Sequence, residues 1–298
     1  MDQIGFIGLG KMGLPMASNL CRKGFSVLAC DVNPEPMRAI AALGAATSTS
    51  VANVAAKSNV IITMLPDSAV VDAVVAGPDG ILANAAQGST ILDMSTIDPH
   101  VTDRLAEAAL AKGIGFVDAP VGRLASHAVR GESLFMVGGS DAEFARVEPL
   151  LEAMGTTIHH CGGVGTGMRT KLVNNFLAIV ACQMNAEAIA LSQRFGLNLE
   201  KTLDVIHGTS ATNGQLKMAW ATKVFKGDTE PGFTIDLAHK DLSLILDAAN
   251  NARVPVATAA AAREAYSSAR GQGEGGKDFS AMVDILCGLA GIEKPRFA

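Results

Sequence analysis

Apolar runs alternate with helical segments along the first 160 residues of the chain. Runs such as 60–64 are apolar at consecutive positions, which is typical of parallel strands covered by helices on both faces. The segments between them repeat apolar residues every three to four positions, as amphipathic helices do. The pattern therefore predicts a doubly wound parallel α/β sheet. The predicted strands are 3–7, 26–30, 59–64, 90–93, 115–118, 133–137 and 157–160, and the predicted helices are 12–23, 34–42, 50–56, 68–74, 100–112 and 141–153.

The pattern changes after the glycine-rich segment 161–167. From about 167 to 194 the chain is apolar and rich in alanine, which predicts one long buried helix closed by Gly196. The remainder has helical periodicity interrupted by glycine and proline. We therefore predict an α/β domain at 1–163 and an all-α domain at 164–298, with the long helix lining the cleft between them.

Three glycines follow the first predicted strand. Gly8, Gly10 and Gly13 spell G-x-G-x-x-G at the start of the first predicted helix. In a β-α-β unit these glycines permit a tight turn, close approach of the backbone to a pyrophosphate, and packing of helix on strand. The helix N-terminus adds N–H donors and a positive dipole end. A glycine-rich turn without a ligand is the alternative, but this context favours a Rossmann-type dinucleotide-binding domain.

The second predicted strand leads directly into Asp31, 18 residues after Gly13. A carboxylate at this position accepts hydrogen bonds from the ribose hydroxyls of the adenosine and repels a 2′-phosphate. Asp31 therefore predicts that NAD (as NADH) is preferred over NADP.

Composition narrows the class of protein. The chain has 298 residues, of which 49% are hydrophobic and 18% charged, and its formal net charge is −5. We find no basic stripe for nucleic acid and no uncharged apolar stretch of membrane-spanning length, so neither partner is predicted. The five cysteines are scattered without a C-x-x-C pair, and no signal peptide is recognisable, so a cytoplasmic protein is expected. His159, His160 and Cys161 lack further ligands at metal-binding spacing, and no metal is predicted.

Candidate chemistry lies just after the predicted strands, where open α/β sheets bind ligands. Polar or turn-forming segments follow three of them, at 63–67, 93–96 and 118–123. We expect these segments to converge where a nicotinamide would lie. Thr96 has two interpretations, as the N-cap of the next helix or as a ligand contact, and the sequence leaves both open.

Lys171 lies near the start of the long helix, with Asn174 and Asn175 one turn later. In an apolar cleft beside a nicotinamide cation, desolvation and like charge would favour release of its proton. Such a lysine can protonate a carbonyl oxygen as hydride arrives at carbon. A solvated helix lysine is the ordinary alternative. The nearby glycine turn and paired asparagines favour the catalytic interpretation.

These motifs together resemble those of the β-hydroxyacid dehydrogenases over essentially the whole chain. The resemblance implies an N-terminal Rossmann domain, a helical C-terminal domain, and a homodimer or homotetramer built through the helical part. The matching motifs are G-F-I-G-L-G-K-M-G-L-P-M at 5–16, D-M-S-T at 93–96, D-A-P-V at 118–121, G-x-x-x-K-x-x-x-N at 167–175 and F-x-x-x-L-x-x-K-D-L at 233–242.

Site residues follow from this resemblance, position by position. It implies that Lys171 is the catalytic acid/base and Asn175 its partner, and that Lys240 closes over cofactor and substrate. The implied cofactor contacts are Gly8, Gly10, Lys11, Met12, Gly13, Asp31, Leu65, Thr96 and Lys240.

One departure bears on the substrate. Most relatives continue D-A-P-V with S-G-G, whereas this chain has Gly122-Arg123-Leu124. The resulting V-G-R is similar to the sulfolactaldehyde reductase branch, and a planar guanidinium suits a sulfonate. Ser126 is the nearest following hydroxyl residue and is offset from the expected position. An alternative is that Arg123 pairs with an acidic residue at a subunit contact.

We therefore expect NADH-dependent reduction of a short anionic aldehyde to the hydroxy acid, with 3-sulfolactaldehyde as first choice. The expected substrate contacts are Gly122, Arg123, Ser126, Asn174 and Asn175. Alternatives are succinic semialdehyde/4-hydroxybutyrate, methylmalonate semialdehyde/3-hydroxyisobutyrate, or a non-catalytic dinucleotide sensor, against which Lys171 argues. The glycine-rich segment 271–278 is expected to be a mobile loop, with a lid role as an alternative.

Overall fold

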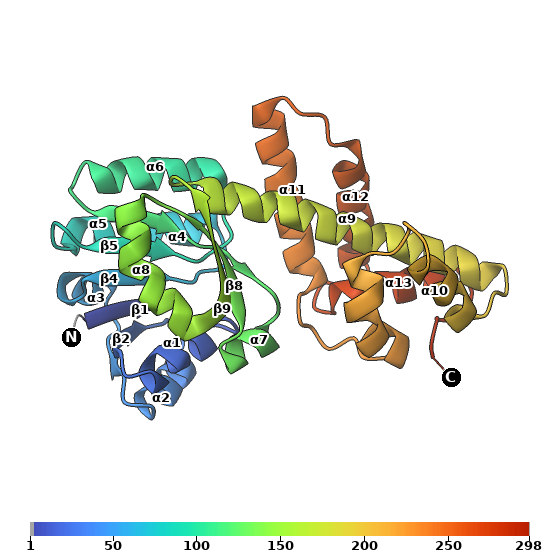
Figure 1. Ribbon diagram of the computed structural model, residues 1–298, viewed down its shortest axis with the longest axis horizontal. Helices are drawn as coiled ribbons and strands as arrows, with labels where there is room; N and C mark the ends of the chain where they lie inside the picture. Colours follow the sequence, from blue (N-terminus) through green and yellow to red (C-terminus); the bar gives the residue numbers. More distant parts are fainter. Residues whose placement is uncertain (1–2, 298) are drawn as a thin grey trace. The chain divides into compact units, whose positions relative to one another are not determined.

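The computed structural model describes residues 3–297 and contains two compact units (Figure 1). The first unit ends at Lys171 and the second begins at Leu172. The predicted junction at 163/164 therefore precedes the start of a long helix whose first residues belong to the first unit.

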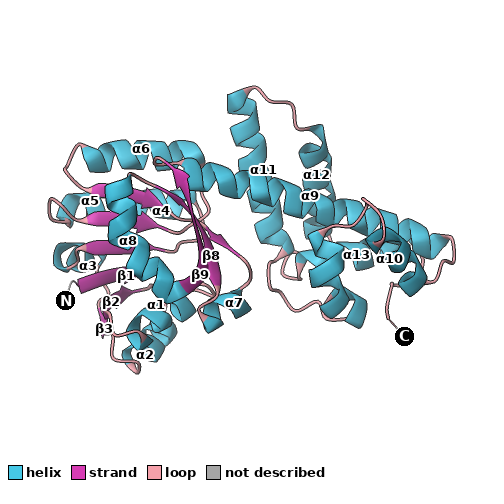
Figure 2. Cartoon of the chain, in the orientation of Figure 1, coloured by secondary structure: helices cyan, strands magenta, loops and turns pink. Residues whose placement is uncertain are grey.

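The first unit is built on a mixed sheet. Its strands, in the described residues, are β1 (Gln3–Ile7), β2 (Ser26–Cys30), β3 (Ala46–Thr47), β4 (Val60–Thr63), β5 (Thr90–Asp93), β6 (Gly115–Asp118), β7 (Val121–Gly122), β8 (Ser133–Gly138) and β9 (Gly155–Gly162). Their order is β3-β2-β1-β4-β5-β6-β8-β7, with β9 beside β8 (Figure 2). The strands from β3 to β6 are parallel, which is the doubly wound dinucleotide-binding order. The predicted fold class is confirmed, although β8 runs antiparallel to β6 and β7.

Helices cover both faces of this sheet, which explains the doubly apolar strands. They are α1 (Gly13–Arg22), α2 (Pro34–Ala41), α3 (Val51–Lys57), α4 (Ser68–Ala76), α5 (Ile81–Asn84), α6 (Pro99–Leu110), α7 (Ala125–Arg130) and α8 (Asp141–Met154). Phe6 and Ile62 belong to the core that includes α1 and α8. Their neighbours Ile7 and Ile61 belong to the core that includes α3 to α6. Successive strand residues therefore pack on opposite faces, as the strand period of two requires.

The second unit is helical in the described residues. It contains most of α9 (Thr166–Arg194) together with α10 (Leu199–His207), α11 (Ile235–Ala252), α12 (Ala257–Gly271) and α13 (Met282–Ala290). Trp220 and Tyr266 lie fully buried in its core. The predicted long helix matches α9 closely, and Gly196 follows it with a positive φ of 69°, the conformation in which glycine commonly ends a helix.

The α9 helix has the length and composition of a membrane-crossing helix, with a mean hydropathy of 1.2 over its most apolar window. Half of that window is buried within the chain's own fold. Core helices of folded domains meet the same criteria, and α9 supplies Ile179, Cys182 and Ile189 to the core of the second unit. Length and composition alone are therefore weak evidence for a membrane span.

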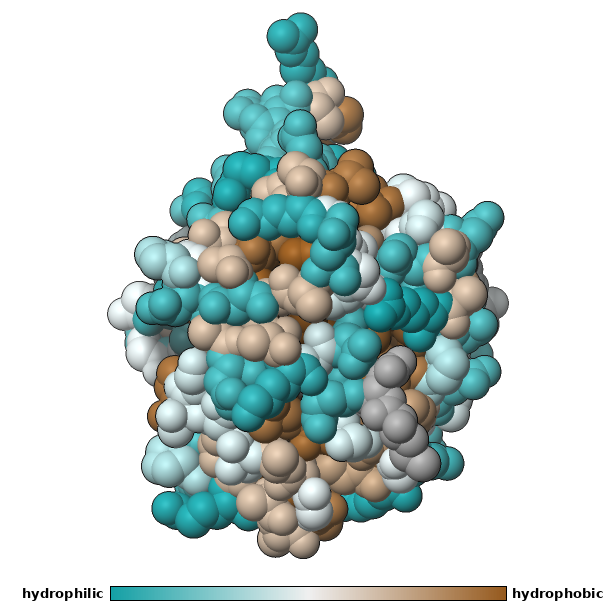
Figure 3. Space-filling view, turned by 90° about the vertical axis from the view of Figure 1, so that its left-hand side faces the viewer, coloured by the Kyte–Doolittle hydropathy of each residue, from teal (hydrophilic) through white to brown (hydrophobic). Residues whose placement is uncertain are grey.

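On the face shown in Figure 3, hydrophilic residues predominate and hydrophobic residues lie in small separate groups. Exposed apolar side chains of the first unit, such as Val32 and Leu110, are widely separated in the sequence. Scattered residues of this kind are normal on a protein surface and do not mark an interaction site.

Candidate active site

The glycine-rich turn between β1 and α1 has the geometry that its motif requires. Gly8 has a φ of 97°, and a Cβ there would lie 2.3 Å from the carbonyl oxygen of Met64. A Cβ on Gly13 would lie 2.0 Å from the carbonyl oxygen of Gly8. A Cβ on Gly10 would meet nothing within 4 Å. Two glycines are therefore needed for the turn and for helix packing, whereas Gly10 faces open space.

The N-terminus of α1 follows this turn directly. Its N-cap is Met12, no side chain caps it within the described chain, and its first turn carries no acidic residue. Lys11 is exposed beside it. An uncapped helix N-terminus with a lysine at its side attracts anions through its N–H groups and its dipole.

Asp31 lies against the same turn, just after β2. One carboxylate oxygen accepts a hydrogen bond from the backbone N–H of Leu9 at 2.5 Å, and the other accepts one from Asn33 at 2.7 Å. The carboxylate is partly exposed. Asp31 is thus fixed beside the glycine turn.

Leu65 and Thr96 follow neighbouring parallel strands, β4 and β5. The backbone N–H of Leu65 donates to the Ser95 hydroxyl at 3.0 Å. The Leu65 side chain lies beside Gly8, because its Cδ2 would be 3.0 Å from a Cβ placed there. The structure brings Leu65 to the glycine turn, and its contact with a cofactor stays a prediction.

The N-cap interpretation of Thr96 is wrong. Helix α6 begins at Pro99, and its N-cap is Asp98, whose carboxylate accepts the N–H of His100 at 2.8 Å. Proline at the first helical position fixes the start of the helix two residues later than the Thr96 interpretation requires. Thr96 itself is partly buried between β5 and this cap.

Asp118, at the end of β6, is fully buried. Its two carboxylate oxygens accept hydrogen bonds from the backbone N–H groups of Gly165, at 2.6 Å, and Met168, at 2.7 Å. Burial raises the pKa of the Asp118 carboxyl to about 6, the N–H bonds oppose that shift, and the nearby Asp93 carboxylate adds to it. Asp93 is the register partner of Asp118 on β5, and burial raises its pKa too. Sequence reasoning did not single out Asp118, although D-A-P-V contains it.

Lys171 reaches the same segment from α9. Its Nζ donates a hydrogen bond to the carbonyl oxygen of Val121 at 2.7 Å, and the side chain is partly buried. Lys171 is the last residue of the first compact unit. The amine thus lies against D-A-P-V and does not project from the outer side of the helix into bulk solvent.

Arg123 occupies a strained turn, with a φ of 70°. Its guanidinium donates to the backbone oxygen of Glu132 at 2.6 Å and to the hydroxyls of Thr156 at 3.2 Å and Thr157 at 3.0 Å. Three of its five N–H donors are used in these bonds. Within the first unit its partners are therefore neutral oxygens, and the carboxylate of Glu132 pairs with Arg130 instead.

Gly122, Ser126 and His127 are close to Arg123 in the sequence. Gly122 is buried in β7, and a Cβ there would approach Leu134 to 3.1 Å. Ser126 is exposed in the first turn of α7. His127 accepts the N–H of Leu124 at 3.4 Å through Nδ1, which makes it a helix-capping residue.

The predicted site residues of the second unit form one polar chain. Asn174 donates to the side-chain oxygen of Asn175 at 3.1 Å, and Asn175 donates to the Asp241 carboxylate at 2.7 Å. Lys240 Nζ lies 3.3 Å from the other oxygen of that carboxylate. Asn175 and Asp241 are buried. Asp241 was not singled out in the sequence, although K-D-L places it next to Lys240.

Of the adjacent histidines of β9, His160 has a packing role, and His159 is exposed. His160 stacks on Phe144 with a ring separation of 4.4 Å, and its Nε2 lies 2.9 Å from the carbonyl oxygen of Gly139. Among residues 3–297, no group of three His, Cys, Asp or Glu side chains is placed to hold a metal ion.

The glycine-rich segment 271–278 is hydrogen-bonded to the start of α11, and its mobility stays a prediction. The N–H of Ile235 donates to the oxygen of Lys277 at 2.9 Å, and that of Asp236 donates to the oxygen of Gly275 at 3.0 Å. A Cβ on Gly275 would lie 2.6 Å from Asp236. Gly275 therefore allows the segment to lie close to Asp236, a purpose that periodicity alone does not distinguish from flexibility.

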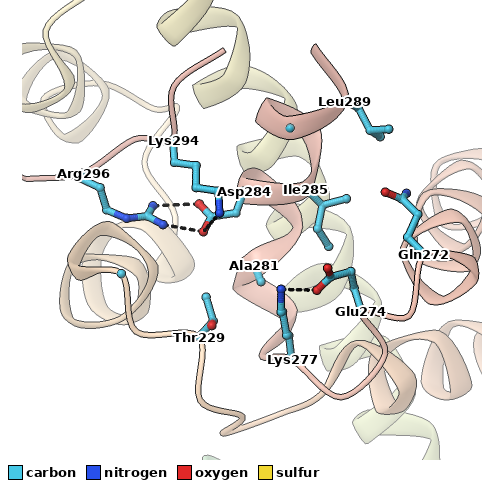
Figure 4. Close-up of a pocket in the computed structure, with 12 residues that line it drawn as sticks. Thr229, Gln272, Glu274, Lys277, Ala281, Asp284, Ile285, Leu289, Lys294 and Arg296 are labelled. Atoms are coloured by element: carbon cyan, nitrogen blue, oxygen red, sulfur yellow. Dashed lines mark hydrogen bonds and ion pairs between the residues drawn. The ribbon is translucent and has the colours of Figure 1, made fainter. Parts of the chain in front are cut away.

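A cavity of about 450 Å³ lies beside this segment (Figure 4). Its charged lining is paired: Arg296 and Lys294 with Asp284, and Lys277 with Glu274. None of the predicted site residues lines it. The cavity is therefore separate from the predicted site residues.

Two family profiles cover most of the chain. The NAD binding domain of 6-phosphogluconate dehydrogenase matches residues 3–163, and the NAD-binding domain of NADP-dependent 3-hydroxyisobutyrate dehydrogenase matches 165–286. A 3-sulfolactaldehyde reductase of Escherichia coli (strain K12) is 41% identical over 98% of each chain. The chain belongs to the β-hydroxyacid dehydrogenase family.

Other members of the family extend this picture. A 2-(hydroxymethyl)glutarate dehydrogenase of Eubacterium barkeri is 37% identical over 97% of this chain and 96% of its own. The solved structure of the Mycobacterium tuberculosis 3-hydroxyisobutyrate dehydrogenase with L-serine has a TM-score of 0.87 at 32% identity, covering 96% of this chain and 99% of that one. As a β-hydroxyacid dehydrogenase, the protein is an NAD(P)-linked oxidoreductase that acts on a CH–OH group.

Proposed function

We propose that this β-hydroxyacid dehydrogenase uses NADH to reduce a short anionic aldehyde, with 3-sulfolactaldehyde reduced to 2,3-dihydroxypropane-1-sulfonate. The observation that carries the proposal is the hydrogen bond between Lys171 Nζ and the Val121 carbonyl. The proposed proton donor thus lies against D-A-P-V, within the first compact unit. The sulfolactaldehyde substrate is supported by the V-G-R sequence and by the named activity of the Escherichia coli relative.

The first unit fits a nicotinamide dinucleotide. The open position at Gly10 and the uncapped start of α1, including Lys11, Met12 and Gly13, suit the pyrophosphate, because backbone and phosphate can approach closely. Asp31 suits the adenosine ribose, and its charge disfavours a 2′-phosphate. Leu65 and Thr96 follow the strands that point toward the nicotinamide end. When bound, the reduced dinucleotide supplies a hydride to the aldehyde carbon.

Lys171 supplies the proton that the aldehyde oxygen takes up during the reduction. Its ammonium gives one proton to the aldehyde oxygen, so that the carbonyl becomes a CH–OH group, and the amine regains a proton from solvent. The Val121 carbonyl holds the ammonium by one of its three donors. Asn175, one helical turn further along α9, is oriented by Asp241 and stays a predicted partner of Lys171. Lys240 stays a predicted cofactor contact, and Asn174 a predicted substrate contact.

Arg123 is the proposed anion-binding residue. Its guanidinium retains two N–H donors beyond those bonded to Glu132, Thr156 and Thr157. Those three contacts also fix the side chain, so less entropy is lost when an anion binds. Gly122 and Ser126, on either side of it in the turn, are the proposed supporting contacts. A sulfonate offers three acceptor oxygens. A fixed, planar guanidinium can donate to more than one of them, which a point charge such as an ammonium does less well.

Arg123→Ala is expected to raise KM for 3-sulfolactaldehyde by about 10- to 100-fold, since a charged hydrogen bond contributes roughly 1.5–3 kcal/mol. Succinic and methylmalonate semialdehydes are predicted to be poor substrates of the wild type and to change less in the variant. The measurement is steady-state NADH oxidation with all three aldehydes.

Arg130→Ala is the matched control, because Arg130 ends α7, the short helix that follows Arg123, and pairs with Glu132 at the surface. An equal loss for sulfonate and carboxylate aldehydes in Arg123→Ala would remove the sulfonate assignment. Preference of the wild type for a carboxylate semialdehyde would favour 4-hydroxybutyrate or 3-hydroxyisobutyrate dehydrogenase activity instead. Tight NADH binding without turnover of any aldehyde would favour a dinucleotide sensor.

We also propose a homodimer or homotetramer formed through α9. Four of its large apolar side chains are more than half exposed, and they recur at intervals of four and seven residues along one side: Val173, Leu177, Met184 and Leu191. A stripe of this kind is typical of a helix that packs against a partner. Sedimentation velocity at micromolar concentration should give a dimer or tetramer, and Leu177→Glu with Met184→Glu should shift it to monomer. A wild-type monomer would contradict the proposal.

The proposed setting is the reducing cytoplasm. All five cysteines are unpaired in the structure, and three of them are buried. Thiols in such positions persist in a reducing compartment. Treatment with a thiol reductant should leave the thermal unfolding temperature of the purified protein unchanged, whereas a loss of stability would point to a disulfide-bonded form.

A further inference from the structure

We propose that Asp118 is the positioning residue that places Lys171, by holding the N-terminus of α9 on the sheet. The inference rests on the proposed role of Lys171 as proton donor. It assigns a role to a buried carboxylate that bonds to the start of α9.

The first link is between Asp118 and the start of the helix. Helix α9 begins at Thr166, and the carboxylate accepts the N–H groups of Gly165 and Met168. The N–H groups of a first turn have no partner within their own helix. A buried carboxylate satisfies two such donors here and also interacts favourably with the positive end of the helix dipole.

The second link connects the same two segments of the chain. It lies three residues further along each segment than the first link. Val121 follows Asp118 by three positions, and Lys171 follows Met168 by three. The Lys171 ammonium donates to the Val121 carbonyl at 2.7 Å. Met168 and Lys171 lie within one helical turn, so a shift at the capped end moves the amine by a similar amount.

Two glycines allow the start of α9 to pack so closely on the sheet that little space is left for the helix to move. A Cβ on Gly167 would lie 2.2 Å from the Met136 oxygen and 2.8 Å from the Asp118 backbone oxygen. A Cβ on Gly138 would lie 2.5 Å from the Asp118 carboxylate. The first turn of α9 therefore rests directly on β6 and β8. This contact gives a physical reason for the glycine in G-x-x-x-K.

Burial disfavours the ionised form of Asp118. Burial raises its pKa to about 6, yet the carboxyl is still ionised at neutral pH. An asparagine would present an NH₂ group to one of the two helix N–H donors and would leave that donor unsatisfied. An ionised carboxylate is thus the group that satisfies both donors.

Asp118→Asn in the full-length protein is the direct test. We expect kcat to fall about 10- to 100-fold, because a shift of about 1 Å in a reacting group can reduce the rate by that order. The KM for the aldehyde and the Kd for NADH, measured by fluorescence titration, should stay within about threefold, a factor worth roughly 0.7 kcal/mol. The basic limb of the kcat–pH profile should move to lower pH, because a negative charge is lost from the segment that Lys171 contacts.

A spectroscopic readout separates positioning from general damage. Reductive ¹³C-methylation of the lysines, with the Lys171 signal assigned through Lys171→Arg, reports its titration by NMR without turnover. The signal should titrate at lower pH in Asp118→Asn than in the wild type. Asp93→Asn is the matched control: it removes an equally buried carboxylate from the adjacent strand, whose hydrogen bonds go to Thr63 and Ser95. It should lower stability without moving the Lys171 titration.

Gly167→Ala is the second variant, since it displaces the same helical turn while every charge is retained. It should lower kcat and preserve NADH affinity, as Asp118→Asn does. An unchanged Lys171 titration and kcat in both variants would overturn the positioning role. Failure of the proposed function is distinguishable, because Lys171→Ala would then remain active whatever Asp118 does.

Discussion

Lys171→Ala is expected to lower kcat for aldehyde reduction by about 10²- to 10⁴-fold, the usual contribution of a positioned general acid. The side chain is partly buried and its Nζ bonds to the Val121 carbonyl, so its removal takes away the proton donor without emptying a large apolar core. The Kd for NADH should change by less than about threefold, which is under 1 kcal/mol. Stopped-flow hydride transfer and NADH fluorescence titration measure the two quantities.

Lys201→Ala is the matched control, because Lys201 is an exposed lysine in the first turn of α10. It removes the same charge and the same length of side chain and should keep the wild-type rate. Lys171→Arg tests the chemistry further, since guanidinium retains the charge but hardly releases a proton. A Lys171→Ala rate within about tenfold of wild type, or roughly 1.4 kcal/mol of barrier, would show that another group is the acid.

Asp31→Ala is expected to change the cofactor preference, measured as the ratio of kcat/KM with NADH to that with NADPH, by about 100-fold. The carboxylate is fixed beside the glycine turn by the N–H groups of Leu9 and Asn33. A fixed carboxylate both binds the ribose hydroxyls and repels a 2′-phosphate, so its loss weakens NADH and admits NADPH. Two such effects, each about 1.4 kcal/mol, multiply to the expected ratio.

Asp141→Ala controls for the charge, because Asp141 is an exposed carboxylate in the first turn of α8, in the same unit. It should leave the NADH/NADPH ratio near the wild-type value. If the ratio is unchanged in Asp31→Ala as well, a different residue reads the ribose, and the preference for NADH loses its structural basis.

Most of the fold could be predicted from sequence patterns that extend over a few residues. The long helix was recognisable because no glycine or proline interrupts 168–194, and α9 begins two residues before that range and ends with it. The glycine turn was recognisable because Gly8 and Gly13 each meet a backbone oxygen from a neighbouring segment. Both features depend on steric rules that act over a few residues, and such rules are legible in a sequence.

Other features depend on contacts between distant positions. The direction of β8 is not encoded in its own pattern, because parallel and antiparallel buried strands share the same apolar run. The two-residue strands β3 and β7 are too short to show a period. Asp118 bonds to N–H groups 47 and 50 residues away, and Asn175 to a carboxylate 66 residues away. Motifs locate such residues, but only tertiary structure reveals what each one holds.

The boundary between the compact units falls inside α9, directly after Lys171. The proposed proton donor therefore stays with the dinucleotide-binding half when β-hydroxyacid dehydrogenases are recombined at 171/172. A crossover at the glycine-rich segment 161–167 instead separates Asp118 from its native helix start and leaves the amine to a foreign first turn. Chimeras intended to exchange helical halves while keeping the chemistry intact are best joined after the lysine.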